Sequence, residues 1–276
     1  MNSQVIEGKN DQLKKDVFKF WNSSPCGTYL ADDLEPGTVA YFNKIDHLRY
    51  NVQPYKYDFI PTVAGFSESK GKTVLEIGCS VGTDLSQFAK NGAIVTGIDL
   101  TEEGIKLAKK RFEVLGLQGT LMTADAENLP FPDNSFDIVY SFGVLHHTPN
   151  TKHAINNEVF RVLKPGGKAV IGLYHKFSYN QLFLIIKAIR NPRLWKYSMF
   201  QRLNLLTEAN KDPNSTIHNP LTKMYTCSEA KELFTNFTDV KTEVYWLNYW
   251  GWLPKFLYNF LDRHFGWYLM ITATKK

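Results

Sequence analysis

Residues 72–83 read KTVLEIGCSVGT, a short run of apolar and β-branched side chains that is closed by glycines. Such a run is typical of a strand that is buried in a parallel sheet. Gly78 and Gly82 stand four residues apart after it, so the backbone can turn tightly there and approach a ligand closely. The helix that follows would aim its N-terminus at that ligand. The stretch therefore predicts a strand, a ligand-binding loop and a helix, in that order.

The same alternation of strand and helix continues as far as residue 175. Four further strand-like runs follow, at residues 92–100, 119–124, 136–141 and 168–174. Apolar residues at helical spacing lie between them, over 105–115 and 155–163, and Thr101 is placed to cap the first of these helices. The turn Pro165-Gly166-Gly167 ends the second helix, because it cannot continue one. Strands that alternate with helices predict βαβ units and a parallel sheet covered on both faces.

Composition places the chain among ordinary globular proteins. It has 276 residues, of which 43% are hydrophobic and 21% charged, and these values exclude a disordered chain, a coiled coil and a collagen-like repeat. Residues 1–175 carry a net charge of −2, whereas residues 176–276 carry +7 and hold 20 of the 39 aromatic side chains. A basic and aromatic C-terminal third suits an acidic, lipidic or flat partner.

Acidic residues follow two of the predicted strands. Ligands of an open parallel sheet bind beyond the carboxyl ends of its strands. Asp99 ends the second strand, where a carboxylate can accept hydrogen bonds from both hydroxyls of a ribose. Asp125 follows the third strand, where an acid can accept from an exocyclic amine. These positions predict a site for a ligand that contains a ribose.

Five motifs stand in order within residues 72–175. They are VLEIGCSVG (74–82), GIDL (97–100), ADAENLPFPDNSFDIVYS (124–141), LHHTP (145–149) and RVLKPGG (161–167). Together they resemble class I S-adenosylmethionine-dependent methyltransferases, most closely the small-molecule group that includes the quinone-biosynthesis C-methyltransferases. The resemblance implies an α/β fold with a Rossmann-like, doubly wound, seven-stranded sheet that is mostly parallel, with its last strand antiparallel. It also implies S-adenosyl-L-methionine as the cofactor and S-adenosyl-L-homocysteine as its product.

The resemblance further implies which residues hold this cofactor. They are Glu76, Gly78, Ser80 and Gly82 around the methionine part, Asp99 on the ribose, Leu100 on the adenine, Asp125 and Ala126 at the adenine edge, and Ser141 and Phe142 near the methionyl end. Ser80 departs from the family pattern, which often has a glycine there, so its side chain is expected to restrict the loop. The first loop is short and lacks a third glycine, which argues against a dinucleotide.

The chain is expected to divide into four parts. Residues 1–70 form an N-terminal helical cap, residues 71–175 the cofactor-binding core, residues 176–225 a lid insertion, and residues 226–276 the C-terminal part of the sheet. Within the last part, the pattern predicts helices over 228–237 and 254–264, strands over 240–246 and 267–274, and an aromatic insert over 247–266. The cap and the inserts lie outside the shared motifs, so they are expected to shape the acceptor pocket.

Methyl transfer from a sulfonium is an in-line displacement, which depends mainly on positioning and on exclusion of water. A general base is needed only when the acceptor must lose a proton. His146, His147 and Tyr174, with His175 beside it, are the candidates at the ends of the fourth and fifth strands. His146 and Tyr174 are preferred, unless the paired histidines only pack and cap their loop. A metal site is not expected because no carboxylate stands at ligand spacing. Cys79 has no adjacent base that would make it a nucleophile.

Aromatic and imidazole side chains outside the shared motifs are the candidates for binding the acceptor. They are Trp21, Tyr50, Tyr55, His147, Tyr245, Trp246 and Trp250. The C-terminal aromatic cluster has three interpretations: the wall of a pocket for an apolar or aromatic molecule, ordinary packing or a dimer contact, or a belt at a membrane interface. Basic residues around Trp195 keep the third interpretation open, so peripheral membrane contact remains a possibility.

The remaining expectations concern substrate class and location. The Asn/Asp-Pro-Pro-aromatic motif of nucleic-acid and glutamine methyltransferases does not follow the fourth strand, so a small molecule is expected rather than nucleic acid. The amino terminus lacks the features of a signal peptide, which favours the cytoplasm. Two other functions stay open: a non-catalytic S-adenosylmethionine-binding regulator or partner subunit, and a methyltransferase of proteins or peptides.

Overall fold

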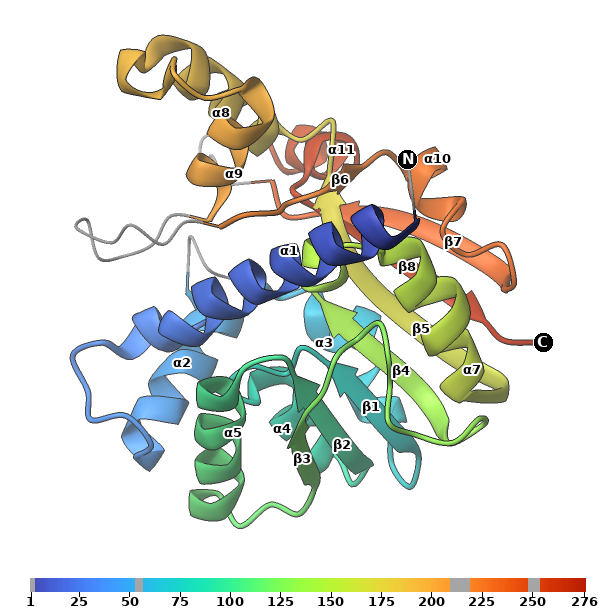
Figure 1. The fold of residues 1–276 in the computed structure, drawn as a ribbon. Coiled ribbons are helices and arrows are strands. Elements are labelled where there is room, and N and C mark those ends of the chain that lie inside the picture. Colours follow the sequence, from blue (N-terminus) through green and yellow to red (C-terminus); the bar gives the residue numbers. More distant parts are fainter. Residues whose placement is uncertain (1–2, 53–56, 209–218, 248–253) are drawn as a thin grey trace.

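The computed structural model describes residues 3–52, 57–208, 219–247 and 254–276, which fold around one twisted sheet (Figure 1). The strands are β1 (Thr73–Ile77), β2 (Ile94–Asp99), β3 (Thr120–Thr123), β4 (Phe136–Phe142), β5 (Leu163–His175), β6 (Met224–Tyr225), β7 (Thr238–Tyr245) and β8 (Tyr268–Thr274). Their order is β3-β2-β1-β4-β5-β8-β7, and the short β6 pairs with β5 off this path.

The strand directions confirm the predicted fold class. Strands β1 to β5 are parallel, β8 runs antiparallel to β5, and β7 runs antiparallel to β8. Strand order reverses between β1 and β4, because the chain first builds outward through β2 and β3 and then returns. A ligand crevice opens at such a reversal, beyond the carboxyl ends of the strands. The mostly parallel, doubly wound sheet is therefore as predicted, and β6 is an addition to it.

Helices cover both faces of the sheet, and each face has its own buried core. One core joins Leu85, Phe88 and Phe112 from α4 (Thr83–Lys90) and α5 (Glu102–Val114) to β1 and β2. The other joins Ile155 and Phe234, from the helical stretch before β5 and the segment after α10 (Cys227–Lys231), to the opposite face. Two covered faces explain why the central strands read as continuous apolar runs.

Two predicted helices and one turn differ from the sequence expectation in detail. The helix before β5 consists of α6 (Thr151–His153), a π-helical stretch (Ala154–Val159) and α7 (Phe160–Val162). The helix predicted over 228–237 ends early, since α10 stops at Lys231. The Pro165-Gly166-Gly167 turn lies within β5, where the pairing jumps from Phe136↔Leu163 to Ile138↔Lys168. The turn is therefore an irregularity in the strand rather than a break before it.

Cap and lid segments surround the carboxyl ends of the strands. The cap contains α1 (Ser3–Ser23), which runs past the ends of the strands in Figure 1, together with α2 (Val39–Asn51) and α3 (Ile60–Ala64). The lid contains α8 (Tyr179–Arg190) packed on α9 (Met199–Thr207), and α11 (Lys255–Phe265) lies close by. None of the described helices is both long enough and apolar enough to cross a bilayer.

Candidate active site

A cavity of about 610 Å³ lies where the strand order reverses, within the usual size range of small-molecule sites. Its floor comes from the ends of β1, β2 and β4 and from the loop after β3. Its roof comes from α1, from α8 and the end of α9, and from residues that flank β7 and β8. Eight of the ten predicted cofactor residues line it: Glu76, Gly78, Ser80, Asp99, Leu100, Asp125, Ala126 and Phe142.

The loop after β1 requires glycine for two separate reasons. Gly78 has a φ of +76°, and a Cβ placed there would lie 2.3 Å from Val144 Cγ2. Gly82 has a φ of +74° and supports the loop from outside the cavity wall, as the N-cap residue of α4. Ser80 also has a positive φ of 45°, and its hydroxyl donates to the Cys26 carbonyl at 3.1 Å. The serine thus ties the loop to the N-terminal cap.

Glu76 lines the cavity and has a buried carboxylate oxygen that is unsatisfied. The residue is 4% exposed, and its Oε2 has no hydrogen-bond partner among the described residues. Burial raises the pKa of Glu76 well above its ordinary value, and the nearby Asp84 adds to this effect. An orphaned acceptor of this kind suits a cationic group, because a partner would recover the free energy of desolvation.

Asp99 holds the first two loops together. Its Oδ2 accepts from the Ser80 backbone N–H at 2.8 Å, and its Oδ1 accepts from the Thr101 N–H and hydroxyl at 2.8 and 2.6 Å. The Leu100 backbone also hydrogen-bonds to this carboxylate, so a ligand hydroxyl would share its acceptor positions with these groups. Thr101 is the N-cap residue of α5, as predicted, but its side chain makes no capping hydrogen bond because the hydroxyl is bound to Asp99.

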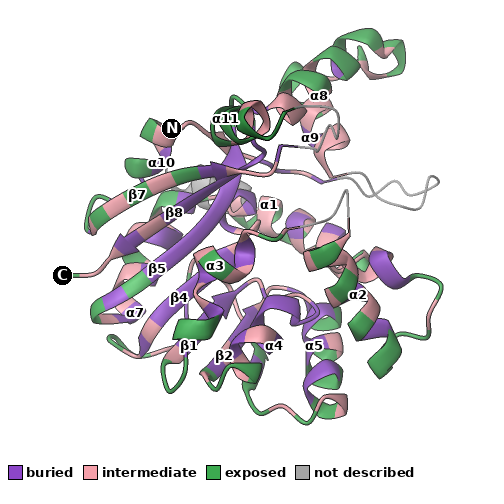
Figure 2. Ribbon diagram, turned by 180° about the vertical axis from the view of Figure 1, so that it is seen from behind, coloured by how far each residue is buried: buried purple, intermediate pink, exposed green. Residues whose placement is uncertain are grey.

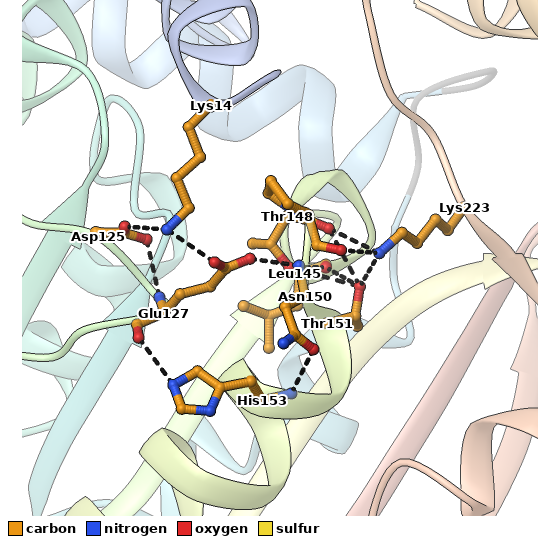
Figure 3. Close-up of polar contacts among 10 residues, drawn as sticks. Lys14, Asp125, Glu127, Leu145, Thr148, Asn150, Thr151, His153 and Lys223 are labelled. Carbon is orange, nitrogen blue, oxygen red and sulfur yellow. Dashed lines mark hydrogen bonds and ion pairs between the residues drawn. The ribbon is translucent and has the colours of Figure 1, made fainter. Parts of the chain in front are cut away.

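A lysine from α1 reaches the loop after β3 (Figure 3). Lys14 Nζ lies 2.7 Å from both Asp125 Oδ2 and Glu127 Oε2, while Asp125 Oδ1 accepts from the Glu127 N–H at 2.9 Å. On the other side of the site, Lys223 donates to the carbonyls of Thr148 and Pro149 in the loop after β4. Two lysines far apart in the sequence thus bind the loops that border the cavity.

Ser141 and Phe142 have different surroundings at the end of β4. Ser141 is buried and its hydroxyl donates to the Ile77 carbonyl at 3.0 Å, so it joins two strands and does not line the cavity. Phe142 lines the cavity and packs against Tyr268, with ring centroids 4.5 Å apart.

An ion pair in the wall of the cavity was not predicted. Arg49 from α2 donates through Nε and Nη2 to the two oxygens of Asp84, at 2.9 and 2.7 Å. Asp84 also accepts from the hydroxyls of Tyr50 and Tyr140. Burial alone would raise the pKa of Asp84, but Arg49 and these hydrogen bonds outweigh it and keep the carboxyl ionised. The pairing joins residues 35 apart, so no local sequence signal indicated it.

The two adjacent histidines take different positions. His146 is fully buried behind the cavity wall, its ring packed at a tilt between those of His147 and Tyr174, and neither ring nitrogen has a described partner. His147 lines the cavity, and its Nδ1 lies 2.6 Å from the Leu221 carbonyl. A carbonyl only accepts, so Nδ1 carries the proton and Nε2 is a free acceptor. Burial lowers the pKa of His147 to about 4, so the ring is neutral at pH 7.

Tyr174 is bound to a carboxylate that the sequence did not indicate. Its hydroxyl donates to Glu208, the C-cap residue of α9, and both side chains line the cavity. Burial raises the pKa of Glu208 to about 7, although the hydrogen bond from Tyr174 opposes this shift. Burial and the nearby Glu208 raise the pKa of Tyr174, so the phenol stays protonated. At the roof of the site, the Tyr174–Glu208 pair can therefore form hydrogen bonds with a ligand and accept a proton.

Aromatic side chains complete the roof. Trp21, Tyr57, Trp246, Trp267 and Tyr268 line the cavity, together with Phe183 from α8. Tyr245 lies outside the wall, where it stacks on Phe59 with centroids 4.7 Å apart, and Tyr50 is likewise outside it. Tyr55 and Trp250, which were predicted to bind the acceptor, lie outside the described residues. In the described ranges, no three His, Cys, Asp or Glu side chains gather as metal ligands.

The sheet order, the antiparallel closing strands and a cavity at the reversal point define the class I methyltransferase fold. Residues 75–171 match the family model described as a methyltransferase domain. The core of the chain is therefore a class I S-adenosylmethionine-dependent methyltransferase domain, which confirms the resemblance seen in the motifs.

Named relatives agree with this family and differ in their acceptors. A fatty-acid O-methyltransferase from Mycolicibacterium smegmatis is 37% identical over 158 residues, 56% of this chain and 53% of that protein. A phthiotriol/phenolphthiotriol dimycocerosates methyltransferase from Mycobacterium tuberculosis is 44% identical over 99 residues, 35% of this chain and 36% of that protein. The matches thus span about half or less of the length of these curated relatives.

A solved structure extends the likeness in fold to nearly the whole chain. Magnesium protoporphyrin IX methyltransferase from Synechocystis PCC 6803, solved with bound SAH, superposes with a TM-score of 0.61 over 95% of this chain and 100% of that one. The two are 17% identical, so the comparison concerns the fold alone.

Proposed function

We propose that this protein transfers a methyl group from S-adenosylmethionine to a small, largely apolar or aromatic acceptor by in-line displacement. The observation that carries the proposal is the division of one cavity into two chemically different halves. Polar groups of the methyltransferase motifs form the floor, and aromatic side chains with few polar groups form the roof. The relatives named for fatty-acid and phthiotriol substrates support an apolar acceptor.

The floor fits the charges of the cofactor. Glu76, with its free carboxylate oxygen, would bind the ammonium of the methionine part. Arg49 uses two of its five donors on Asp84, so it retains donors for the carboxylate of the same part. Asp99 would accept from the ribose, and Leu100 and Ala126 would border the adenine. When bound, the cofactor supplies a methyl group that its sulfonium already activates.

The roof would orient the acceptor and exclude water. Trp246, Trp267 and Tyr268 offer apolar surface against which a flat or hydrocarbon molecule can pack. His147 Nε2 is a free hydrogen-bond acceptor in this wall. The Tyr174–Glu208 pair can bind a hydroxyl or carbonyl of the acceptor and take up a proton if the acceptor loses one. His146 lies behind this wall, so in this proposal it positions Tyr174 and His147 rather than touching the acceptor.

The first test is calorimetric titration of the protein with S-adenosylmethionine and S-adenosylhomocysteine. Micromolar affinity is expected, which corresponds to about −8 kcal/mol for a 1 μM site. Asp99→Asn should weaken binding by at least about tenfold, because an amide is a poorer acceptor for a ribose hydroxyl. Asp99→Ala also removes the acceptor of three internal hydrogen bonds, so its unfolding must be measured beside its binding.

Activity is then tested with cofactor that carries a labelled methyl group. Transfer of the label to lipids or aromatic metabolites in an extract supports the proposed acceptor class. Binding without transfer to any acceptor would favour the non-catalytic regulator, and transfer to protein alone would favour the protein methyltransferase. Absence of cofactor binding by the folded wild type would refute the proposal.

A further inference from the structure

Large apolar side chains are exposed mainly on one part of the molecule. Of the fourteen exposed large hydrophobic residues among those described, eleven fall in residues 177–200 and 256–265. We call these exposed side chains the lid surface: Phe177, Leu182, Phe183, Ile186, Ile189, Trp195, Met199, Phe200, Phe256, Phe260 and Phe265. A monomeric protein rarely leaves so many large apolar side chains together in water, so this surface indicates a binding partner.

Helix α8 turns much of its apolar surface outward. Ile186 and Ile189 are 46% and 53% exposed, and Ala188 is the one buried residue of the helix. Figure 2 shows α8 coloured mainly as exposed, at the edge of the molecule. The first turn of α8 and the end of α11 border a shared groove of about 700 Å³, so the two helices form one continuous surface.

The charges on the part of this surface formed by residues 177–200 have one sign. Residues 177–200 contain four basic residues, Lys187, Arg190, Arg193 and Lys196, and no acidic residue. All four are exposed, and none forms an ion pair with another described residue. Unpaired cations beside exposed apolar side chains are the combination by which interfacial helices bind anionic lipids.

We propose that the lid surface docks on an anionic phospholipid bilayer. Ile186, Ile189 and their apolar neighbours would enter the interface, while the four basic side chains would bind lipid phosphates. A second copy of the chain fits less well. A two-fold contact sets the same surface against itself, so unpaired cations of both copies would face one another.

Docking in this way would place the site next to the bilayer. Phe183 belongs both to the lid surface and to the wall of the cavity, and Leu184 beside it also lines the cavity. An apolar acceptor could therefore pass from the membrane to the roof of the site along α8. This second step rests on the proposed function and identifies the acceptor as a membrane-resident lipid. Docking on the bilayer does not depend on the proposed function.

Flotation with lipid vesicles tests the docking, using the full chain without cofactor. The protein is expected to float with vesicles of phosphatidylcholine and phosphatidylglycerol, to bind vesicles of phosphatidylcholine alone at least about tenfold more weakly, and to release the anionic vesicles as salt rises. Lys187→Glu with Arg190→Glu should weaken binding by about tenfold or more. Ile186→Ser with Ile189→Ser should weaken it as well, because less apolar surface enters the interface.

The matched control is Lys70→Glu with Lys109→Glu, which makes the same change in net charge at exposed positions outside the lid surface. It should change vesicle affinity by less than about twofold. Equal weakening by both pairs, or no flotation of the wild type, would overturn the proposal. A stable dimer that Ile186→Ser with Ile189→Ser dissociates would overturn it too, because the surface would then be a self-contact. Calorimetric titration of the same samples with S-adenosylmethionine shows separately whether cofactor binding is retained.

Discussion

The floor and the roof of the cavity differ in how the chain builds them. The floor uses short, contiguous motifs at the ends of β1 and β2 and after β3, where the strand itself places the next residue. The roof gathers side chains from α1, from α8 and α9 and from the flanks of β8. The floor therefore depends on backbone geometry, whereas the roof depends on contacts between distant segments. The difference leads us to expect that binding of the cofactor and choice of the acceptor are separable properties of this fold.

The largest effect is expected at the Arg49–Asp84 ion pair, which joins the N-terminal cap to the floor. Arg49→Met leaves Asp84 as an uncompensated charge, which should lower the free energy of unfolding by about 3–5 kcal/mol. Chemical denaturation measures this loss. The double variant Arg49→Met/Asp84→Asn removes both charges and should be less destabilised than Arg49→Met alone. A single variant as stable as the wild type would mean that cap and floor are not coupled here.

Substitution of Gly78 tests whether the backbone conformation of the loop after β1 determines the structure of the floor. Gly78→Ala adds both a strained left-handed alanine and a clash with Val144, so we expect a loss of about 2–4 kcal/mol in unfolding and no measurable cofactor binding. Gly71→Ala is the matched control, since Gly71 has a φ of +73° but nothing within 4 Å of the added Cβ. It should cost about 1 kcal/mol and leave binding unchanged. Equal effects of Gly78→Ala and Gly71→Ala would exclude the clash with Val144 as the cause of the lost stability and binding.

Substitution of Glu208, the carboxylate in the roof, tests whether the acceptor side of the cavity takes up a proton during methyl transfer. The pKa of Glu208 is raised to about 7, so its carboxylate form grows as pH rises through that value. If Glu208 accepts the proton, the rate constant for transfer should rise to a plateau above pH 7. Glu208→Gln should then lower the plateau on the order of a hundredfold and remove the inflection. His147 titrates near 4, and burial raises the pKa values of Tyr57, Tyr174 and Tyr268, so none of these gives an inflection near 7.

Tyr174→Phe serves as the comparison for that experiment. Its hydroxyl lowers the pKa of Glu208, so its removal should move the inflection of the rate profile to higher pH. An unchanged profile in both variants would show that the transfer step needs no proton acceptor at this position.

The smallest effect is expected at the contact between α1 and the floor. Lys14 is partly exposed, so Lys14→Met should lower the free energy of unfolding by about 1 kcal/mol or less. It should also speed release of S-adenosylhomocysteine, which stopped-flow displacement measures, because α1 would hold the adenine end less firmly. Lys15→Met, at an exposed neighbouring position, should change neither quantity. Equal release rates in all three proteins would mean that α1 does not retain the product.

These tests also mark how far the sequence could predict the site. Gly78 and Asp99 were predicted from their places at strand ends and Glu76 from the family resemblance, and all three line the cavity. Glu208 and Arg49 were missed because their roles arise from contacts across 34 and 35 residues, for which the local sequence has no signal. The parallel sheet was predictable from the alternation of strand and helix, which permits few topologies, whereas its doubly wound, seven-stranded form was implied by the family resemblance. The position of His146 within its motif did not predict its surroundings, because His147 and not His146 lies in the cavity wall.

The place of Glu208 at the end of α9 has one more consequence. The segment that covers the acceptor also supplies the carboxylate that holds Tyr174, so a displacement of α9 uncovers the cavity and removes that carboxylate together. Closure of the cavity and placement of the proton-accepting carboxylate would therefore occur together in this fold. If Glu208 accepts the proton as proposed, the protein should be unreactive while its substrate enters and leaves and reactive only in the enclosed state.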